Sequence, residues 1–170
     1  MNKLREIKLA KRSDGFCIQF DAMASPCEVI IETSDPALAK QLGEQVSTEV
    51  WRIEDKYSRY NSDSLCSQIN QSQGKPIAID DETFALLNFA DTCYQLSDGI
   101  FDITSGVLRK VWCFDCSDNI PTSLAVKKAM ENVGWHKIKY DNRQVTLPIN
   151  MEIDFGGIGK EYAVDRAIVL

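Results

Sequence analysis

One segment constrains the fold of this chain more than any other: the residues from 36 onward have the pattern of a long amphipathic helix. Apolar side chains recur there at spacings of three and four residues, as on one face of an α-helix. This stripe consists of Leu38, Leu42, Val46, Val50, Ile53 and Tyr57. Asp35 suits the N-cap and Pro36 the first turn. The sequence therefore predicts a long helix that begins at Pro36 and ends near "KYSRYN", residues 56–61.

The segments around this helix predict both strands and helices. "GFCIQFDAM" and "SPCEVIIET" are rich in β-branched and aromatic residues and predict two strands, with a hairpin or tight bend at the "ASP" between them. The other predicted elements are a helical turn at 65–70, a strand at 77–80, a helix from Asp80 or Asp81 to the turn at 98–99, a partly extended stretch at 100–112, a helix from 121–123 to 134, a hairpin over 135–147, a strand at 151–155 and a last helix from 157. Interleaved helices and frequent hairpins favour an α+β fold with an antiparallel sheet.

Composition excludes several classes of function. A length of 170 residues is that of one ordinary domain. A net charge of −6 argues against a nucleic-acid surface, so an anionic ligand must be held locally by a metal, a helix N-terminus or one placed cation. Residues 1–16 lack the apolar core of a signal peptide, and no run approaches the roughly 18 apolar residues of a membrane span. The sequence predicts a cytoplasmic location.

The cysteines and the histidine give little support to a metal or nucleophile site. Most of the six cysteines lie in apolar or mixed runs where a small buried side chain fits. Cys113 and Cys116 form "CFDC", the one redox- or metal-like spacing, but neither a second pair nor a strand-to-helix context accompanies it. Free thiols are favoured. His136 is predicted to lie in a hairpin strand, without placeable partners for a nucleophile relay.

Four stretches carry candidate binding chemistry. In "DFGGIGKEYAVD", residues 154–165, a glycine-rich turn leads into a helix whose free N–H groups suit a phosphate. The spacing is neither that of a dinucleotide fingerprint nor that of a P-loop, and a purely structural tight turn is an equal alternative. The other three stretches are "SDGIFDITSG", "DAMASPCE" and "KYSRYNSDS". Their structural alternatives are a turn with capping side chains, a core segment and a helix-ending cap.

Taken in order, these stretches resemble the ApbE family, the FAD:protein FMN transferases. The residues that carry the resemblance are "FDAMASPCEV", "IEDKYSRYNSDSLCSQIN", "SDGIFDITSGVLRKVW" and "IDFGGIGKEYAVDRA", which extend from about residue 20 to the end. The resemblance implies a T-fold-like α+β architecture in which an antiparallel sheet packs against helices. It also implies that FAD is the substrate, that Mg²⁺ is the cofactor, and that FMN is attached to a Thr or Ser hydroxyl of a redox-complex subunit while AMP is released.

The resemblance also assigns residues to the flavin and its nucleotide. Met23 is expected to pack on the flavin, and Tyr60 to stack on the isoalloxazine ring. Ile100, Phe101 and Asp102 are expected to line the adenosine or pyrophosphate part of FAD.

Further expectations concern the glycine-rich turn. Asp154 and Lys160 are expected to contact FAD, with the lysine as the cation for phosphate, and Gly157 to offer its backbone carbonyl to the metal. Two positions depart from the family pattern. Ala24 and Glu161 occupy positions where the family often has glycine, and Glu161 brings a negative charge near the expected phosphates.

Family members are longer than this chain, and their remaining metal ligands and proposed catalytic base lie in the second half. Residues 1–170 are therefore expected to be the N-terminal portion of an ApbE-like domain, apparently truncated, with no catalytic residue assigned and no transferase activity alone. The alternatives are a non-catalytic module that binds FAD or FMN and a fragment that self-associates through its apolar end at Ile168–Leu170.

Overall fold

The structure is a computed structural model that describes residues 5–112 and 120–170. The chain forms two compact units. Unit 1 comprises Met1–Ser58 and Ile158–Leu170, and unit 2 comprises Arg59–Gly157. Both units mix helices with antiparallel strands, so the predicted α+β class is confirmed.

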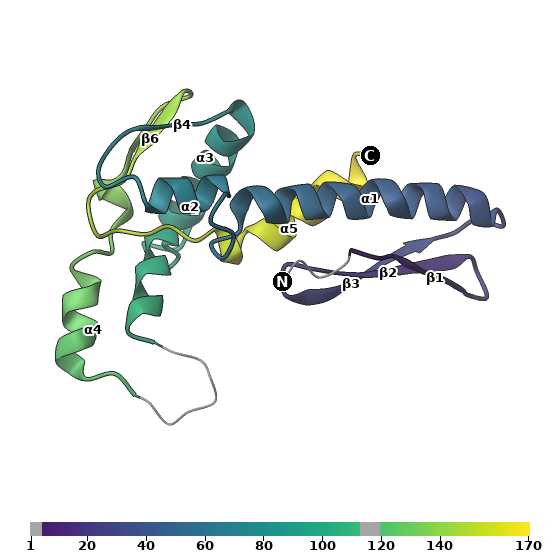
Figure 1. Cartoon of the computed structure of the whole chain (residues 1–170), viewed down its shortest axis with the longest axis horizontal. Coiled ribbons are helices and arrows are strands. Elements are labelled where there is room, and N and C mark those ends of the chain that lie inside the picture. Colours follow the sequence, from purple (N-terminus) through teal and green to yellow (C-terminus); the bar gives the residue numbers. More distant parts are fainter. Residues whose placement is uncertain (1–4, 113–119) are drawn as a thin grey trace. The chain divides into compact units, whose positions relative to one another are not determined.

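Unit 1 consists of a three-stranded antiparallel sheet and two helices (Figure 1). Its elements are β1 (Lys8–Lys11), β2 (Phe16–Ala22), β3 (Ser25–Ile31), α1 (Pro36–Tyr57) and α5 (Gly159–Ile168). The strand order is β1-β2-β3, and α1 lies along one face of this sheet. Alternate side chains of β2 point towards α1, as the period of two in a strand requires, and Ile18 among them is fully buried.

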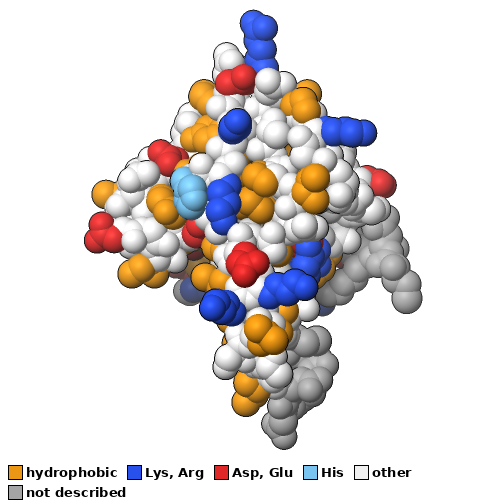
Figure 2. All heavy atoms as spheres, turned by 90° about the vertical axis from the view of Figure 1, so that its left-hand side faces the viewer, with side chains coloured by type: hydrophobic (Ala, Val, Ile, Leu, Met, Phe, Trp, Pro, Cys, Tyr) orange, Lys and Arg blue, Asp and Glu red, His pale blue; other side chains and the backbone are white. Residues whose placement is uncertain are grey.

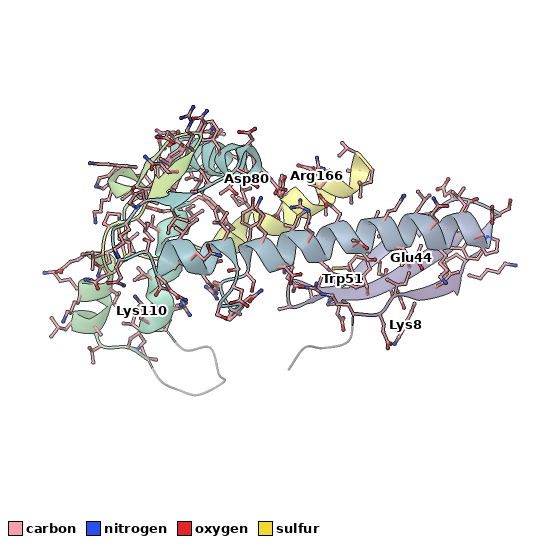
Figure 3. All side chains as sticks on the ribbon, turned by 45° about the horizontal axis from the view of Figure 1, so that its top comes forward. Lys8, Glu44, Trp51, Asp80, Lys110 and Arg166 are labelled. Carbon is pink, nitrogen blue, oxygen red and sulfur yellow. The ribbon has the colours of Figure 1, made fainter. Side chains whose placement is uncertain are left out.

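The predicted long helix is confirmed as α1. One residue explains where α1 starts, and another explains how it can lie close to the sheet. The Asp35 side chain accepts a hydrogen bond from Ala37 N at 2.8 Å and so caps α1. A Cβ at Gly43 would lie only 2.5 Å from Ile18 Cγ1, so the glycine lets α1 lie close to β2. In Figure 3, Trp51 points from α1 to the sheet, where its ring meets Phe20 edge-on at 5.6 Å.

Unit 2 is built from shorter elements around one apolar core. They are α2 (Leu65–Asn70), β4 (Ile77–Ala78), α3 (Asp81–Leu96), η1 (Ile103–Lys110), α4 (Ser123–Met130), η2 (Trp135–Lys137), β5 (Lys139–Tyr140), β6 (Gln144–Thr146) and η3 (Phe155–Gly157). The strands form a small antiparallel sheet in the order β4-β6-β5. Fully or almost fully buried side chains fill the unit, including Ile69, Leu87, Val107, Val145, Leu147, Ile153 and Phe155.

Four predictions about local structure are wrong in part. The stretch 100–112 contains the 3₁₀-helix η1, and residues 151–154 form no strand. His136 lies in the short 3₁₀-helix η2 instead of a hairpin strand. The bend between β2 and β3 falls at Met23 and Ala24, so that Ser25 and Pro26 already belong to β3. The strand β1 was not predicted, because its four residues are all exposed and carry no apolar alternation.

The strand predicted at 151–155 does not form, for a clear physical reason. The segment is buried, but its backbone is paired by a side chain instead of a neighbouring strand. The Asn70 amide accepts from Ile153 N at 2.7 Å and donates to Ile153 O at 3.0 Å. Asp154 N then donates to Ile103 O at 2.8 Å. Apolar residues in sequence predict burial here, but they do not reveal which group satisfies the backbone.

The remaining sequence predictions have mixed outcomes. Cys17 and Cys66 are buried free thiols, and Cys27 and Cys93 are half-buried free thiols. The "CFDC" motif lies outside the described residues. Within the ranges that the structure describes, no helix is long and apolar enough to cross a membrane. The cytoplasmic location stays a prediction.

The acidic net charge is not spread evenly over the surface. Figure 2 shows the side of the molecule on which α4 and β6 lie in Figure 1, and lysine and arginine side chains there lie among acidic and hydrophobic ones. On α4, Leu124 is 77% exposed, and Lys127 and Lys128 are exposed beside it. A negative total charge therefore leaves room for locally basic surface, and the absence of a nucleic-acid partner stays a prediction.

Candidate functional site

The first group of predicted site residues lies at the end of the β2–β3 hairpin in unit 1. Ala22 pairs with Ser25, which leaves Met23 and Ala24 as a two-residue loop. Both have left-handed backbone, with φ of 50° and 56°, as in a type I′ turn. A residue other than glycine costs about 1–2 kcal/mol in this backbone conformation, so other residues must stabilise the loop. That support is a hydrogen bond of 2.6 Å from Met23 N to Glu54 Oε1 on α1.

Lys160 reaches the same hairpin from the first turn of α5. Its Nζ donates to Ser25 Oγ at 2.8 Å, one residue past the Met23–Ala24 loop. Lys160 is exposed, and the N-terminal end of a helix adds a favourable field for anions. Glu161 is also exposed. Unit 1 thus brings the predicted flavin contact and the predicted phosphate cation to one end of one hairpin.

A cavity of about 880 Å³ opens beside this hairpin. Its wall includes Phe20, Ala24 and Cys27 from the strands and loop, together with Arg5 and Glu54. The volume falls in the range of small-molecule sites, and the lining mixes apolar surface with charged groups. Burial raises the pKa of the Cys27 thiol, which keeps it protonated and argues against a nucleophilic role.

The second group lies in unit 2 and centres on an ion pair. Arg59 Nη1 contacts Asp154 Oδ2 at 2.5 Å, across 95 residues of sequence. The same guanidinium donates to the Tyr60 hydroxyl at 2.8 Å and lies 4.9 Å from the centre of the Tyr60 ring. Tyr60 is 79% exposed, so the predicted exposed aromatic side chain is present. Arg59 therefore links two predicted FAD contacts, Tyr60 and Asp154.

The charges near this pair have a clear electrostatic effect. Burial opposes the charged form of Arg59, but the Tyr60 hydroxyl and the Asp154 carboxylate outweigh it and raise the pKa of Arg59. Burial raises the pKa of the neighbouring Cys66 thiol to about 12, and the Asp154 carboxylate adds to this rise. The thiol is thus a buried structural group, and the guanidinium is a permanent cation.

Both oxygens of the Asp102 carboxylate accept hydrogen bonds from within the protein. Its Oδ1 accepts from Thr104 N at 2.8 Å and from Thr104 Oγ1 at 2.7 Å, and its Oδ2 accepts from Trp135 N at 3.0 Å. The Thr104 hydroxyl in turn accepts from Gly134 N at 2.8 Å. Asp102 caps η1 and ties it to the first residue of η2. A capping role, the structural alternative for this stretch, is present, and contact of Asp102 with FAD stays a prediction.

The neighbours of Asp102 differ in exposure. Ile100 is 90% exposed, while Phe101 is half-buried. A Cβ at Gly157 would lie 2.8 Å from Phe101 Cε2, so a glycine at position 157 allows the ring to pack against the backbone.

The described residues do not by themselves form a complete magnesium site. Within residues 5–112 and 120–170, no group of three His, Cys, Asp or Glu side chains converges on one point. The carboxylate nearest in sequence to Gly157 is Asp154, and it already accepts from Arg59 and from Gly156 N at 2.9 Å. Mg²⁺ needs several oxygen ligands in near-octahedral order, and one carbonyl is insufficient.

Sequence reasoning gave no role to Glu54 or Arg59, although both lie in the quoted stretch 53–70. Their partners are 31 and 95 residues away. Spacing along the chain cannot reveal contacts at such separations. The available signal is position in the sequence: Arg59 precedes Tyr60, which is expected to stack on the flavin, and Glu54 lies near the predicted end of the helix.

The antiparallel sheets and packed helices, with candidate ligand residues on a hairpin and a glycine-rich turn, define an α+β protein with candidate small-molecule contacts in both units. The chain matches the ApbE family over residues 23–170, and it belongs to that family. It is 30% identical to the FAD:protein FMN transferase of Chlamydia muridarum, over 84% of this chain and 47% of that protein. It is 24% identical to the enzyme of the same name from Klebsiella pneumoniae, over 85% and 46%.

Solved structures show the same fold. The ApbE protein from Thermotoga maritima superposes with a TM-score of 0.80 at 24% identity, over 95% of this chain and 51% of that one. Flavin transferase ApbE from Vibrio cholerae gives a TM-score of 0.76 at 20% identity, over 96% and 53%. The predicted fold and family are confirmed. The chain spans about half the length of the curated relatives it matches.

Proposed function

We propose that this chain binds FAD and contributes to the transfer of FMN from FAD to a threonine or serine hydroxyl of a target protein. The observation that supports this most is family membership, because the matched segment 23–170 contains every predicted site residue. The curated relatives that it resembles carry the name FAD:protein FMN transferase. The acceptor is proposed to be a subunit of a redox complex.

In the proposed reaction, the acceptor oxygen attacks the phosphorus on the FMN side of the pyrophosphate. The bond from that phosphorus to the bridging oxygen breaks, and AMP leaves with this oxygen. The acceptor hydroxyl gives up its proton to a base that is not assigned among the described residues. Negative charge grows on the bridging oxygen, so positive groups near the phosphates accelerate the step.

Lys160 is the proposed phosphate contact in unit 1. Its ammonium group is exposed, lies in the first turn of α5, and is directed to the hairpin by Ser25. In unit 2, the exposed ring of Tyr60, with Arg59 against it, supports stacking on the flavin. Asp154 already pairs with Arg59, so its proposed FAD contact shares the carboxylate with this cation.

Mg²⁺ is the proposed cofactor, and it would neutralise charge on the phosphate oxygens. We assign the Gly157 carbonyl as one ligand. We propose that waters, FAD phosphate oxygens and groups other than a cluster of the described acidic side chains complete its coordination. We therefore propose that this chain alone binds FAD without transferring FMN.

A titration with FAD tests the proposed function. Flavin fluorescence should change on binding, and Lys160→Met should weaken binding about tenfold, as expected for loss of a charge-assisted contact. Lys40→Met, at an exposed position on α1, is the matched control and should bind like the wild type. Absence of FAD binding, or equal affinities of both variants, contradicts the proposal. Incubation with FAD, Mg²⁺ and an acceptor peptide should give no flavinylated peptide by mass spectrometry.

Self-association is a second candidate property of the isolated chain. Apolar side chains on α5 and just after it are strongly exposed: Val164 at 59%, Ile168 at 77%, Val169 at 69% and Leu170 at 56%. Exposed apolar patches often mark association surfaces. Size-exclusion chromatography should show a species larger than the monomer, and Ile168→Lys should reduce it. A monomer at all concentrations contradicts this candidate.

A further inference from the structure

The loop at Met23 and Ala24 has a conformation that its own residues disfavour. Both residues have positive φ, and neither is the glycine or asparagine that a type I′ turn prefers. In solution, such a loop populates several conformations unless other residues hold it. The residues that hold it therefore decide how often the binding-competent loop is present.

Two side chains of α1, one helical turn apart, form hydrogen bonds with the backbone at the end of this hairpin. Glu54 Oε1 accepts from Met23 N at 2.6 Å. Trp51 Nε1 donates to Asp21 O at 2.9 Å, two residues before Met23. Both bonds engage backbone atoms, so they fix the course of the chain instead of a side-chain rotamer.

Arg5 in turn holds both of these side chains. Its Nη2 lies 3.2 Å from Glu54 Oε2, the carboxylate oxygen that Met23 does not use. Its guanidinium lies 5.6 Å from the centre of the Trp51 ring, a cation–π distance. Hydrogen bonds of 2.6 and 2.7 Å to the two oxygens of Asp55 fix the guanidinium on α1. Arg5 precedes the segment 23–170 that matches the family, so this support is not part of the family match.

We propose that Glu54, with Trp51 and Arg5 behind it, is a positioning residue that holds the Met23–Ala24 loop in the conformation that binds the flavin. This inference rests on the proposed function, in which Met23 contacts FAD. Arg5, Glu54 and Ala24 also line the cavity beside the hairpin, so the support and the loop share one wall. If the loop is released, the apparent dissociation constant rises as the inverse of the fraction of molecules that keep the binding-competent loop.

The test compares Glu54→Ala, Glu54→Gln and Glu44→Ala in the full chain. Glutamine keeps an oxygen that can accept from Met23 N, and alanine removes it. Glu44 lies on the same helix, and its side chain forms an ion pair with Lys40, so Glu44→Ala is the control. We expect Glu54→Ala to weaken FAD binding about tenfold, and Glu54→Gln to restore most of the affinity.

Amide hydrogen exchange of Met23 in the absence of FAD provides a second readout. Exchange should be faster in Glu54→Ala than in Glu44→Ala, and Arg5→Met should have a smaller effect in the same direction.

If the wild type binds FAD but Glu54→Ala matches Glu44→Ala in affinity, the positioning role alone is wrong. If the wild type binds no FAD, the proposed function is wrong as well. If Glu54→Ala does not fold, Glu54→Gln and Arg5→Met test the inference instead. In that case, the inference is contradicted if the Met23 amide exchanges at an unchanged rate in Arg5→Met and Glu54→Gln also loses affinity for FAD.

Discussion

Units 1 and 2 are stabilised in different ways. In unit 1, a helix of 22 residues packs on a sheet whose β2 and β3 pair over seven residues, so regular backbone hydrogen bonds dominate. In unit 2, the strands have two or three residues, and side chains such as Asp102 and Asn70 bond directly to backbone groups. Unit 1 therefore depends on the fit between its elements, while unit 2 depends on single polar side chains.

The largest effect is expected from Asp102→Ala in unit 2. The variant leaves Thr104 N, the buried Thr104 hydroxyl and Trp135 N without their acceptor. Unsatisfied buried donors cost about 1–3 kcal/mol each, so we expect a loss of about 3 kcal/mol in the free energy of unfolding. Urea unfolding gives the total, and hydrogen exchange shows whether residues 59–157 lose protection. Asp81→Ala, at an exposed position, is the control. If both variants are equally stable, unit 2 does not depend on Asp102 as this comparison of the two units requires.

An intermediate effect is expected from Gly43→Val in unit 1. The new Cβ would meet Ile18 Cγ1 at 2.5 Å, and Ile18 is fully buried. Overpacking of this kind costs about 2 kcal/mol. The matched control is Gly159→Ala on α5, where a Cβ meets nothing within 4 Å. Thermal unfolding should show a lower midpoint for Gly43→Val only. If Gly43→Val were as stable as the control, fit between α1 and β2 would not be what limits unit 1.

The smallest effect concerns acid and the attachment of α5 to α1. Glu49 on α1 accepts from Arg52 at 2.8 Å and from Arg166 of α5, labelled in Figure 3, at 3.2 Å. The hydrogen bond from Arg52, followed by that from Arg166, lowers the pKa of Glu49 although burial opposes the shift. The folded state thus binds this proton less readily than the unfolded state. The stabilisation is present above the ordinary glutamate pKa of about 4.3 and is lost as the pH falls through the lowered value.

Because Arg52 and Arg166 are 42% and 43% exposed, solvent screening keeps this contribution below about 1 kcal/mol. Urea midpoints at pH 7 and pH 3 should differ less for Glu49→Gln than for the wild type. If the urea midpoint depends on pH identically in both proteins, Glu49 does not contribute to the acid sensitivity of the fold.

The sequence predicted unit 1 better than unit 2. The period of the apolar residues after Pro36 and the β-branched runs around residues 16–31 belong to long elements, whose repeated pattern is strong. In unit 2, the 3₁₀-helix η1 and the segment 151–154 are set by Asp102 and Asn70. Asn70 bonds to Ile153, 83 positions away, while Asp102 caps η1 through nearby Thr104 and also bonds to Trp135, 33 positions away. A short element carries too few residues for its period to be read.

The candidate site divides in the same way. Position in the motifs was enough to name Tyr60, Asp154 and Lys160, and their chemistry follows from residue type. The sequence did not reveal that Asp154 pairs with Arg59, that Lys160 bonds Ser25, or that Glu54 holds Met23 N. These are contacts between side chains and distant partners, and no local pattern encodes them.

The class of fold, the long amphipathic helix, the first hairpin and the family can be read from the amino-acid sequence, because they depend on local periodicity and on residues in fixed order. Which polar groups meet depends on how the chain packs. The folded chain satisfies buried hydrogen-bonding groups by bringing distant residues together, and Asp102, Asn70 and Glu54 have their roles through that packing.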